Sequence, residues 1–109
     1  MGKKSDFLPG TLEMLILKTL SLGSQHGYGI AQHIKQTSDS VLNVEEGSLY
    51  PALQRLLVQG FVNAEWGQSE TNRRARYYSL TPAGRKRYGE EVSQFEELIA
   101  AIGRVLQTA

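Results

Sequence analysis

The stretch over residues 46–80, EGSLYPALQRLLVQGFVNAEWGQSETNRRARYYSL, changes its hydrophobic period once and thereby indicates the fold. Its first part predicts a helix from Glu46 to Gln59 that Gly60 ends, since apolar residues recur there at helical spacing over about 100° of arc. This arc is one face of the helix, and it would pack on a core. The apolar face consists of Leu49, Leu53, Leu56 and Leu57.

After this helix the hydrophobic period falls from 3.6 residues to two. Val62, Ala64 and Trp66 alternate with polar residues, which predicts a β-strand. A polar tip over 67–74 separates it from a second predicted strand over 76–80. The two strands together predict a β-hairpin with a long tip.

The sequence on both sides of this stretch predicts three further helices. One covers 12–22 and ends at Gly23, and another begins within 26–30. A brief β-like stretch is expected over 41–44. On the C-terminal side, Thr81 and the proline after it are typical of a helix start, and this helix can run to about residue 107.

Three helices followed by a hairpin are typical of a winged helix, a helix-turn-helix variant that carries a β-wing. We therefore expect a mainly α fold with a small β-hairpin, followed by a long C-terminal helix. The expected domains are a winged-helix DNA-binding domain over 1–80 and a dimerisation helix over 81–109.

Composition removes several classes of protein. The 109 residues suffice for one domain, and the absence of cysteine excludes disulfides, thiolate zinc sites and a cysteine nucleophile. Pro9, Glu13 and Lys18 interrupt the apolar residues near the N-terminus, so no signal peptide or membrane span is expected. We expect a soluble cytoplasmic protein.

The face of the 46–59 helix opposite its leucines carries candidate DNA-binding side chains. Glutamine and arginine can read adenine and guanine edges through paired hydrogen bonds, and serine and tyrosine commonly hold phosphates. A merely solvated helix face has a similar composition, so both interpretations stay open. The candidates are Ser48, Tyr50, Pro51, Gln54 and Arg55.

Positive charge gathers around the predicted wing. Residues 70–88 hold six arginines and lysines against the single Glu70, a local charge of +5 in a chain whose net charge is +1. Arg73 and Arg74 at the tip, with Arg76 beyond it, suit phosphates or a narrow minor groove. The alternative is a loop that serves only solubility.

The last helix has a different character. Residues 89–109 hold four glutamates against Arg104, a local charge of −3 that DNA would repel. Its apolar residues follow a heptad pattern, which predicts packing on a second copy of the chain. Packing on the domain's own core is the alternative. The expected dimerisation residues are Met14 and Leu17 of the first helix with Val92, Phe95, Ile99, Ile102 and Leu106.

Catalytic and metal-binding interpretations find no support. His26 and His33 lie seven residues apart without a carboxylate pattern, so they do not predict a metal site. The glycines of the 27–29 segment lack the third glycine and the preceding strand of a dinucleotide site. We expect no catalytic residue, no metal and no cofactor.

Four motifs resemble the PadR family of bacterial transcriptional regulators, especially its short subfamily with a single C-terminal helix. They cover nearly the whole chain and read GTLEMLIL at 10–17, HGYGI at 26–30, GSLYPAL at 47–53 and RYYSLTPAG at 76–84. The resemblance implies a homodimeric winged-helix repressor of a roughly palindromic operator. It places Ser48 and Tyr50 in the major groove, the 73–74 arginines on the backbone or in the minor groove, and the first and last helices in the dimer.

Two departures from the family pattern affect DNA affinity and effector binding. Glu45 and Glu46 stand where the family often has serine and proline, which adds negative charge beside the helix that would read DNA. Some members stack flat ligands on a tryptophan of the last helix, whereas the single tryptophan here, Trp66, lies in the wing. The candidates for an effector contact are therefore Trp66 and Phe95.

These observations predict a homodimeric, sequence-specific DNA-binding regulator, a repressor that an effector releases from double-stranded DNA. Two alternatives stay open: a small-molecule-binding protein, and a winged-helix module that binds a protein partner without binding an operator.

Overall fold

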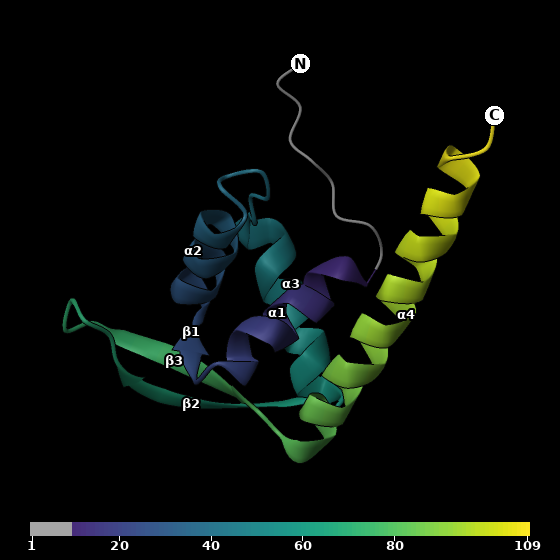
Figure 1. Ribbon diagram of the computed structural model, residues 1–109. Coiled ribbons are helices and arrows are strands. Elements are labelled where there is room, and N and C mark those ends of the chain that lie inside the picture. The colour runs from purple at the N-terminus through teal and green to yellow at the C-terminus, as the bar shows by residue number, and fades with distance from the viewer. Residues whose placement is uncertain (1–9) are drawn as a thin grey trace.

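The computed structural model describes residues 10–109, so Pro9 and the residues before it lie outside this description. The described part contains four helices and three strands, and it confirms the predicted winged-helix fold (Figure 1). In chain order these are α1 (Thr11–Ser21), β1 (Gln25–His26), α2 (Gly27–Thr37), α3 (Glu46–Val58), β2 (Val62–Gln68), β3 (Arg74–Leu80) and α4 (Pro82–Leu106).

The core lies between α1, α2, α3 and the base of the hairpin. Of the leucine face predicted for α3, Leu49, Leu53 and Leu56 are buried there and Leu57 is partly buried. The middle of α1 is also buried. Leu17, which we expected in a subunit interface, has no exposed surface and belongs to the protein's own core, so it is not available to a second chain. The apolar second side of α1 is thus covered within the chain.

The sheet has a third strand that the sequence did not indicate. β1 pairs with β3 in an antiparallel manner, with Gln25 opposite Tyr78 and His26 opposite Tyr77, so the strand order is β1-β3-β2. Two residues are too few to show a period of two, and this strand exists only because β3 lies beside it. It attaches the hairpin directly to the start of α2.

The prediction of a β-like stretch over 41–44 is wrong. These residues form no strand ladder in the structure and connect α2 to α3 as irregular chain. Asp39 and Ser40 both have positive φ, 54° and 66°, and redirect the chain after α2. A strand requires a hydrogen-bonded partner, and no sheet edge of the described chain pairs with this connection.

The hairpin is longer, and its tip shorter, than expected. β2 continues to Gln68 and β3 starts at Arg74, so the turn covers only 69–73 instead of 67–74. The Tyr77 hydroxyl donates a hydrogen bond to the Gln68 carbonyl oxygen (2.9 Å) and braces the two strands near their ends. Arg74 is therefore a strand residue, and its side chain lies on a defined face of the hairpin.

α4 begins on the domain and then leaves it. The Thr81 hydroxyl accepts a hydrogen bond from the Gly84 N–H (3.0 Å) and donates one to the Gly60 carbonyl (2.7 Å). Gly84 is buried against the Phe61 backbone, and Tyr88 packs on the core. The first turns of α4 thus belong to the domain, although the expected boundary was residue 80.

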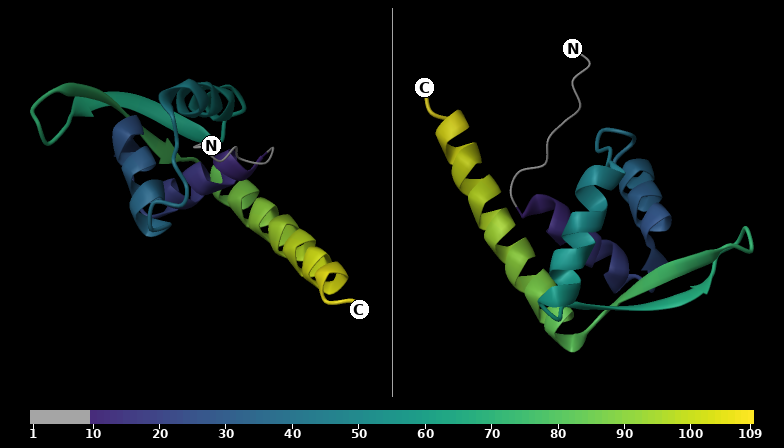
Figure 2. Two further views of the ribbon diagram at one scale, coloured as in Figure 1. Left: turned by 90° about the horizontal axis from the view of Figure 1, so that it is seen from above. Right: turned by 180° about the vertical axis from the view of Figure 1, so that it is seen from behind.

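The hairpin and α4 extend from opposite sides of the helical body (Figures 1 and 2). The resulting molecule is elongated, with principal dimensions of 57 × 36 × 20 Å. Among the described residues, no helix is long and apolar enough to cross a membrane.

Candidate nucleic-acid interface

One face of the hairpin is buried at its base and open near its tip. Val62 and Tyr78 on this face belong to the core. Further along the same face stand Trp66, Arg74 and Arg76, all of them exposed, with Trp66 directly opposite Arg76 in the ladder. Side chains alternate between the two faces of a strand. These three side chains therefore point to the same side as the buried residues at the base of the hairpin, which is the side on which α2 and α3 lie.

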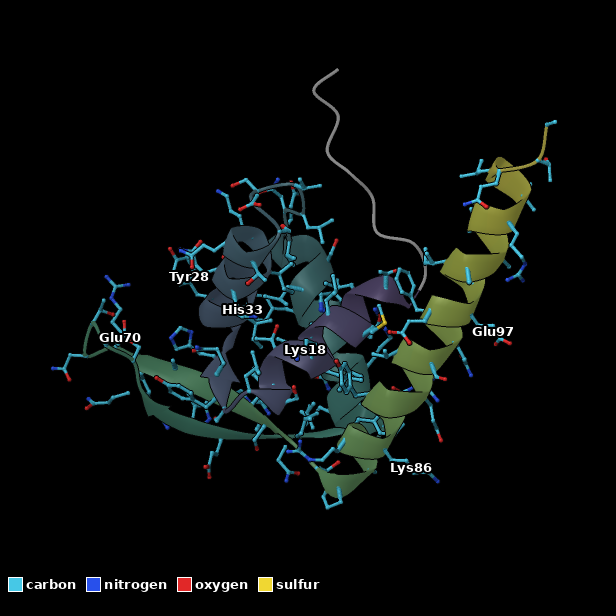
Figure 3. The ribbon with its side chains drawn as sticks, in the orientation of Figure 1. Lys18, Tyr28, His33, Glu70, Lys86 and Glu97 are labelled. Atoms are coloured by element: carbon cyan, nitrogen blue, oxygen red, sulfur yellow. The ribbon has the colours of Figure 1, made fainter. Side chains whose placement is uncertain are left out.

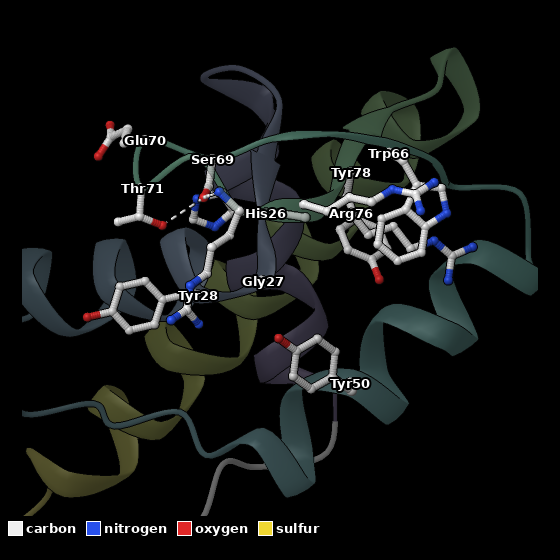
Figure 4. Close-up of a pocket in the computed structure, with 13 residues that line it drawn as sticks. His26, Gly27, Tyr28, Tyr50, Trp66, Ser69, Glu70, Thr71, Arg76 and Tyr78 are labelled. Atoms are coloured by element: carbon white, nitrogen blue, oxygen red, sulfur yellow. Dashed lines mark hydrogen bonds between the residues drawn. The ribbon is translucent and has the colours of Figure 1, made fainter.

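A groove of about 950 Å³ results between the hairpin, the start of α2 and the start of α3 (Figure 4). Of the predicted DNA-binding residues, four line it: Tyr50 from α3 and three arginines from the hairpin. Tyr28 of α2 and Trp66 of β2 also line this groove. The three arginines are Arg73, Arg74 and Arg76.

The groove is cationic, and aromatic rings support its cations. The guanidinium carbon of Arg74 lies 4.7 Å from the centre of the Trp66 ring. The guanidinium carbon of Arg76 lies 5.9 Å from the centre of the Tyr78 ring. Such contacts hold a guanidinium over an aromatic face while its N–H groups stay free for another acceptor. Among the groove's lining residues, only Glu70 is acidic. The groove therefore suits an anionic partner.

Tyr50 contributes a protonated hydroxyl to this groove. Partial burial, and next the nearby Glu46 and Tyr78, raise its pKa above the ordinary value of 10.0, so it remains a hydrogen-bond donor at neutral pH. Within residues 10–109 no group forms a hydrogen bond with the Tyr50 hydroxyl. The side chain is 45% exposed, so the hydroxyl is accessible to a ligand in the groove.

The other candidates on α3 lie outside the groove. Ser48, Pro51 and Gln54 are exposed, as the helical period predicts. Arg55 is also exposed, but its Nε and Nη2 atoms donate to one carboxylate oxygen of Glu13 on α1, at 2.9 and 2.7 Å. The guanidinium is thus held against α1, and Arg55 does not line the groove.

Two residues of this surface were not among the predicted site residues. Tyr28 is an exposed ring at the groove, and His26 lines it while its Nδ1 accepts a hydrogen bond from the Gly29 N–H (3.0 Å) to cap α2. The ring of His26 also meets Tyr77 edge-on, with centroids 5.2 Å apart. Tyr28 lies between two glycines at the start of α2, but no local pattern of the sequence indicates that it reaches the groove.

A second notable surface is the apolar face of α4. Val92 and Phe95 of the predicted heptad seam are half-buried, whereas Ile99, Ile102 and Leu106 are exposed, together with Leu98 and Val105. Glu97 points away from the helical body on the outer side of the helix (Figure 3). In the described part of the chain, the apolar side of α4 is thus partly covered at Val92 and Phe95, whereas its large apolar residues from Leu98 onward are exposed.

A smaller pocket of about 310 Å³ lies where α1 meets α4, lined by Met14, Phe95 and Leu98 among others. The two effector candidates consequently stand in different places, with Phe95 at this pocket and Trp66 at the groove. In the described part of the chain, no cluster of three histidine, aspartate or glutamate side chains could hold a metal ion.

Comparisons with known proteins agree with this architecture. The model of the transcriptional regulator PadR-like family matches residues 16–90. The structure of a transcriptional regulator from Clostridium thermocellum is similar, with 32% identity, a TM-score of 0.83, and coverage of 92% of this chain and 97% of that one. A PadR family transcriptional regulator from Eggerthella lenta is 30% identical, with a TM-score of 0.77 over 92% of this chain and 85% of that one.

A longer relative contains a similar segment. The 37.1 kDa protein of transposon TN4556 from Streptomyces fradiae is 38% identical over 97 residues, which is 89% of this chain. This match covers 26% of the relative, so the chain corresponds to about a quarter of that protein.

Proposed function

This chain belongs to the PadR-like family of transcriptional regulators, and on that premise we propose that it is a homodimeric repressor of a palindromic operator. Membership of the family makes it a DNA-binding regulator and not an enzyme. The homodimer, the palindromic operator, the repression and its release by an effector are the parts proposed here.

The observation that carries the proposal is the cationic groove between the hairpin and α3. Arg73, Arg74 and Arg76 lie there beside Tyr50, on the side where α3 exposes its polar face. Arginine side chains and a tyrosine hydroxyl are common donors to DNA phosphates. A duplex that receives α3 in its major groove would present phosphates to this groove.

In this docking the remaining residues of the α3 face take distinct roles. Ser48 and Gln54 are exposed and able to reach base edges, and Pro51 presents an apolar surface between them. Arg55 would reach DNA only after leaving Glu13, so we assign it to holding α3 against α1 in the free protein.

The proposed dimer uses the exposed apolar side of α4. Ile99 and Ile102 are 49% and 44% exposed, and a heptad seam of this kind is covered when a second helix packs on it. The acidic side of α4 would stay away from DNA. Two copies related by a two-fold axis would place their α3 helices about 34 Å apart, or a small multiple of it, in successive major grooves.

The proposed effector site is the pocket between α1 and α4. A small molecule seated against Phe95 and Met14 would contact both the domain and the dimer helix. A ligand that favours one angle between these parts shifts the spacing of the two α3 helices and lowers operator affinity. As a transcriptional regulator that binds DNA, the protein would act in the bacterial cytoplasm.

The proposal is tested by titrating the protein against DNA from upstream of its own gene and against a scrambled fragment of equal length. Binding measured by fluorescence anisotropy at about 150 mM salt should be about 1,000-fold tighter or more for the upstream fragment, the lower end of the usual ratio of specific to non-specific affinity. Equal affinity for both fragments would contradict it.

A further inference from the structure

Gly27, the first residue of α2, is not needed for its backbone conformation. It is not among the glycines with positive φ, which are Gly10, Gly23 and Gly60 among the described residues. An alanine could adopt its helical conformation and would favour the helix by up to about 1 kcal/mol. Backbone conformation therefore does not explain why residue 27 is a glycine.

The reason is the side chain of Tyr50, 23 residues further along the chain. A Cβ atom at Gly27 would lie 2.7 Å from the Tyr50 hydroxyl oxygen and 3.0 Å from both Cε1 and Cζ. These distances are shorter than van der Waals contact, so any side chain at residue 27 would displace the ring. Gly47, Gly89 and Gly103 have no atom within 4 Å of such a Cβ.

This contact fixes a residue of the recognition surface. The Tyr50 hydroxyl lies over Gly27 at the edge of the groove (Figure 4), and no group in the described chain holds it by a hydrogen bond. The position of the ring therefore depends on packing, and Gly27 is a buried surface on which it packs. A methyl group on that surface would shift the ring without removing it.

We propose that Gly27 is a positioning residue that seats the Tyr50 ring and thereby sets the affinity of α3 for the operator. This inference rests on the proposed DNA-binding function. Packing on Gly27 orients the tyrosine side chain in the free protein. DNA binding therefore does not have to supply the conformational entropy of ordering this side chain. Gly29, two residues later, has a different neighbour, because its Cβ would meet the Gln25 side chain.

The test is a double-mutant cycle of Gly27→Ala and Tyr50→Ala in the full chain, with Gly89→Ala as the matched control on an open helix face. Operator affinity and urea unfolding are measured for all five proteins, wild type included. Gly27→Ala should weaken operator binding roughly tenfold, about the effect of losing one hydrogen bond to a charged phosphate. In the Tyr50→Ala background the same change should alter binding less than about twofold, since no ring remains to be displaced.

The control should bind like the wild type. The double variant relieves the crowding, so it should fold even if Gly27→Ala alone does not. Wild-type affinity for Gly27→Ala, or an equal decrease in both backgrounds, would overturn the inference. A wild-type protein without operator preference would overturn both proposals, whereas operator binding that is insensitive to Gly27→Ala would overturn this one alone.

Discussion

Thr81 shows how one side chain joins three parts of the molecule. Its hydroxyl caps α4 through Gly84 and donates to the carbonyl of Gly60, the residue that lies between α3 and β2. The proline after it signalled the helix start in the sequence, but the hydrogen bond to Gly60 spans 21 residues and had no sequence signal.

Thr81→Ala should therefore destabilise the protein by about 1–2 kcal/mol, because it removes a helix cap, typically worth about 1 kcal/mol, together with the hydrogen bond to Gly60. Thr81→Ser, which keeps the hydroxyl, should cost much less. Urea unfolding followed by circular dichroism measures both. Equal destabilisation by the two variants would show that the methyl group, and not the hydroxyl, matters.

The residues of the candidate site were predictable to different degrees. The exposed face of α3 follows from helical periodicity, so Ser48 and Gln54 were placed correctly on the surface. The ion pair of Arg55 with Glu13 joins residues 42 apart, and only the packing of α3 on α1 creates it. Tyr28 entered the groove because β1 draws the start of α2 beside β3, which no local pattern indicates.

At the scale of elements, the hairpin is the part whose function depends most on register. The sequence placed positive charge in a tip, whereas pairing over Val62–Gln68 and Arg74–Leu80 turns Arg74 and Arg76 to the groove side. The strand ends could not be read from the sequence, because polar residues continue through them. The long helices, by contrast, were predicted to within about two residues because their periods are strong.

Arg74→Ala with Arg76→Ala should lower the salt dependence of operator binding. The slope of log K against log salt falls by about 0.9 for each phosphate that the protein no longer neutralises, so a reduction between about 0.9 and 1.8 is expected. Arg104→Ala, near the end of α4, removes a cation far from the groove and should leave the slope unchanged. Anisotropy titrations at several salt concentrations give these slopes, and an unchanged slope in the double variant would exclude these arginines from binding phosphates.

At the scale of the whole molecule, α4 extends past the helical body (Figure 2). In the described part of the chain, the large apolar residues of its C-terminal half are exposed. The near-neutral net charge of +1 combines a basic hairpin region with an acidic last helix. The heptad pattern of α4 was visible in the sequence, but the burial of Leu17 within the chain was not, since periodicity does not say which neighbour covers a face.

Ile99→Glu with Ile102→Glu should produce a monomer, because two carboxylates would be buried in the proposed interface. Both residues are exposed in the single chain, so its fold and helix content should persist. Ser93→Glu, at an exposed position of α4 outside the apolar side, should remain dimeric. Sedimentation equilibrium measures the mass, and a dimer of the double variant would refute an interface through this face.

The central claim is that two copies of this chain dock their α3 helices on one palindromic site. Hydroxyl-radical footprinting of the wild-type protein on its upstream DNA tests it most directly. Two protected regions should appear, related by two-fold symmetry, with centres about 34 Å or a small multiple of it apart along the duplex. A single protected region without symmetry, or uniform protection of the fragment, would contradict the account.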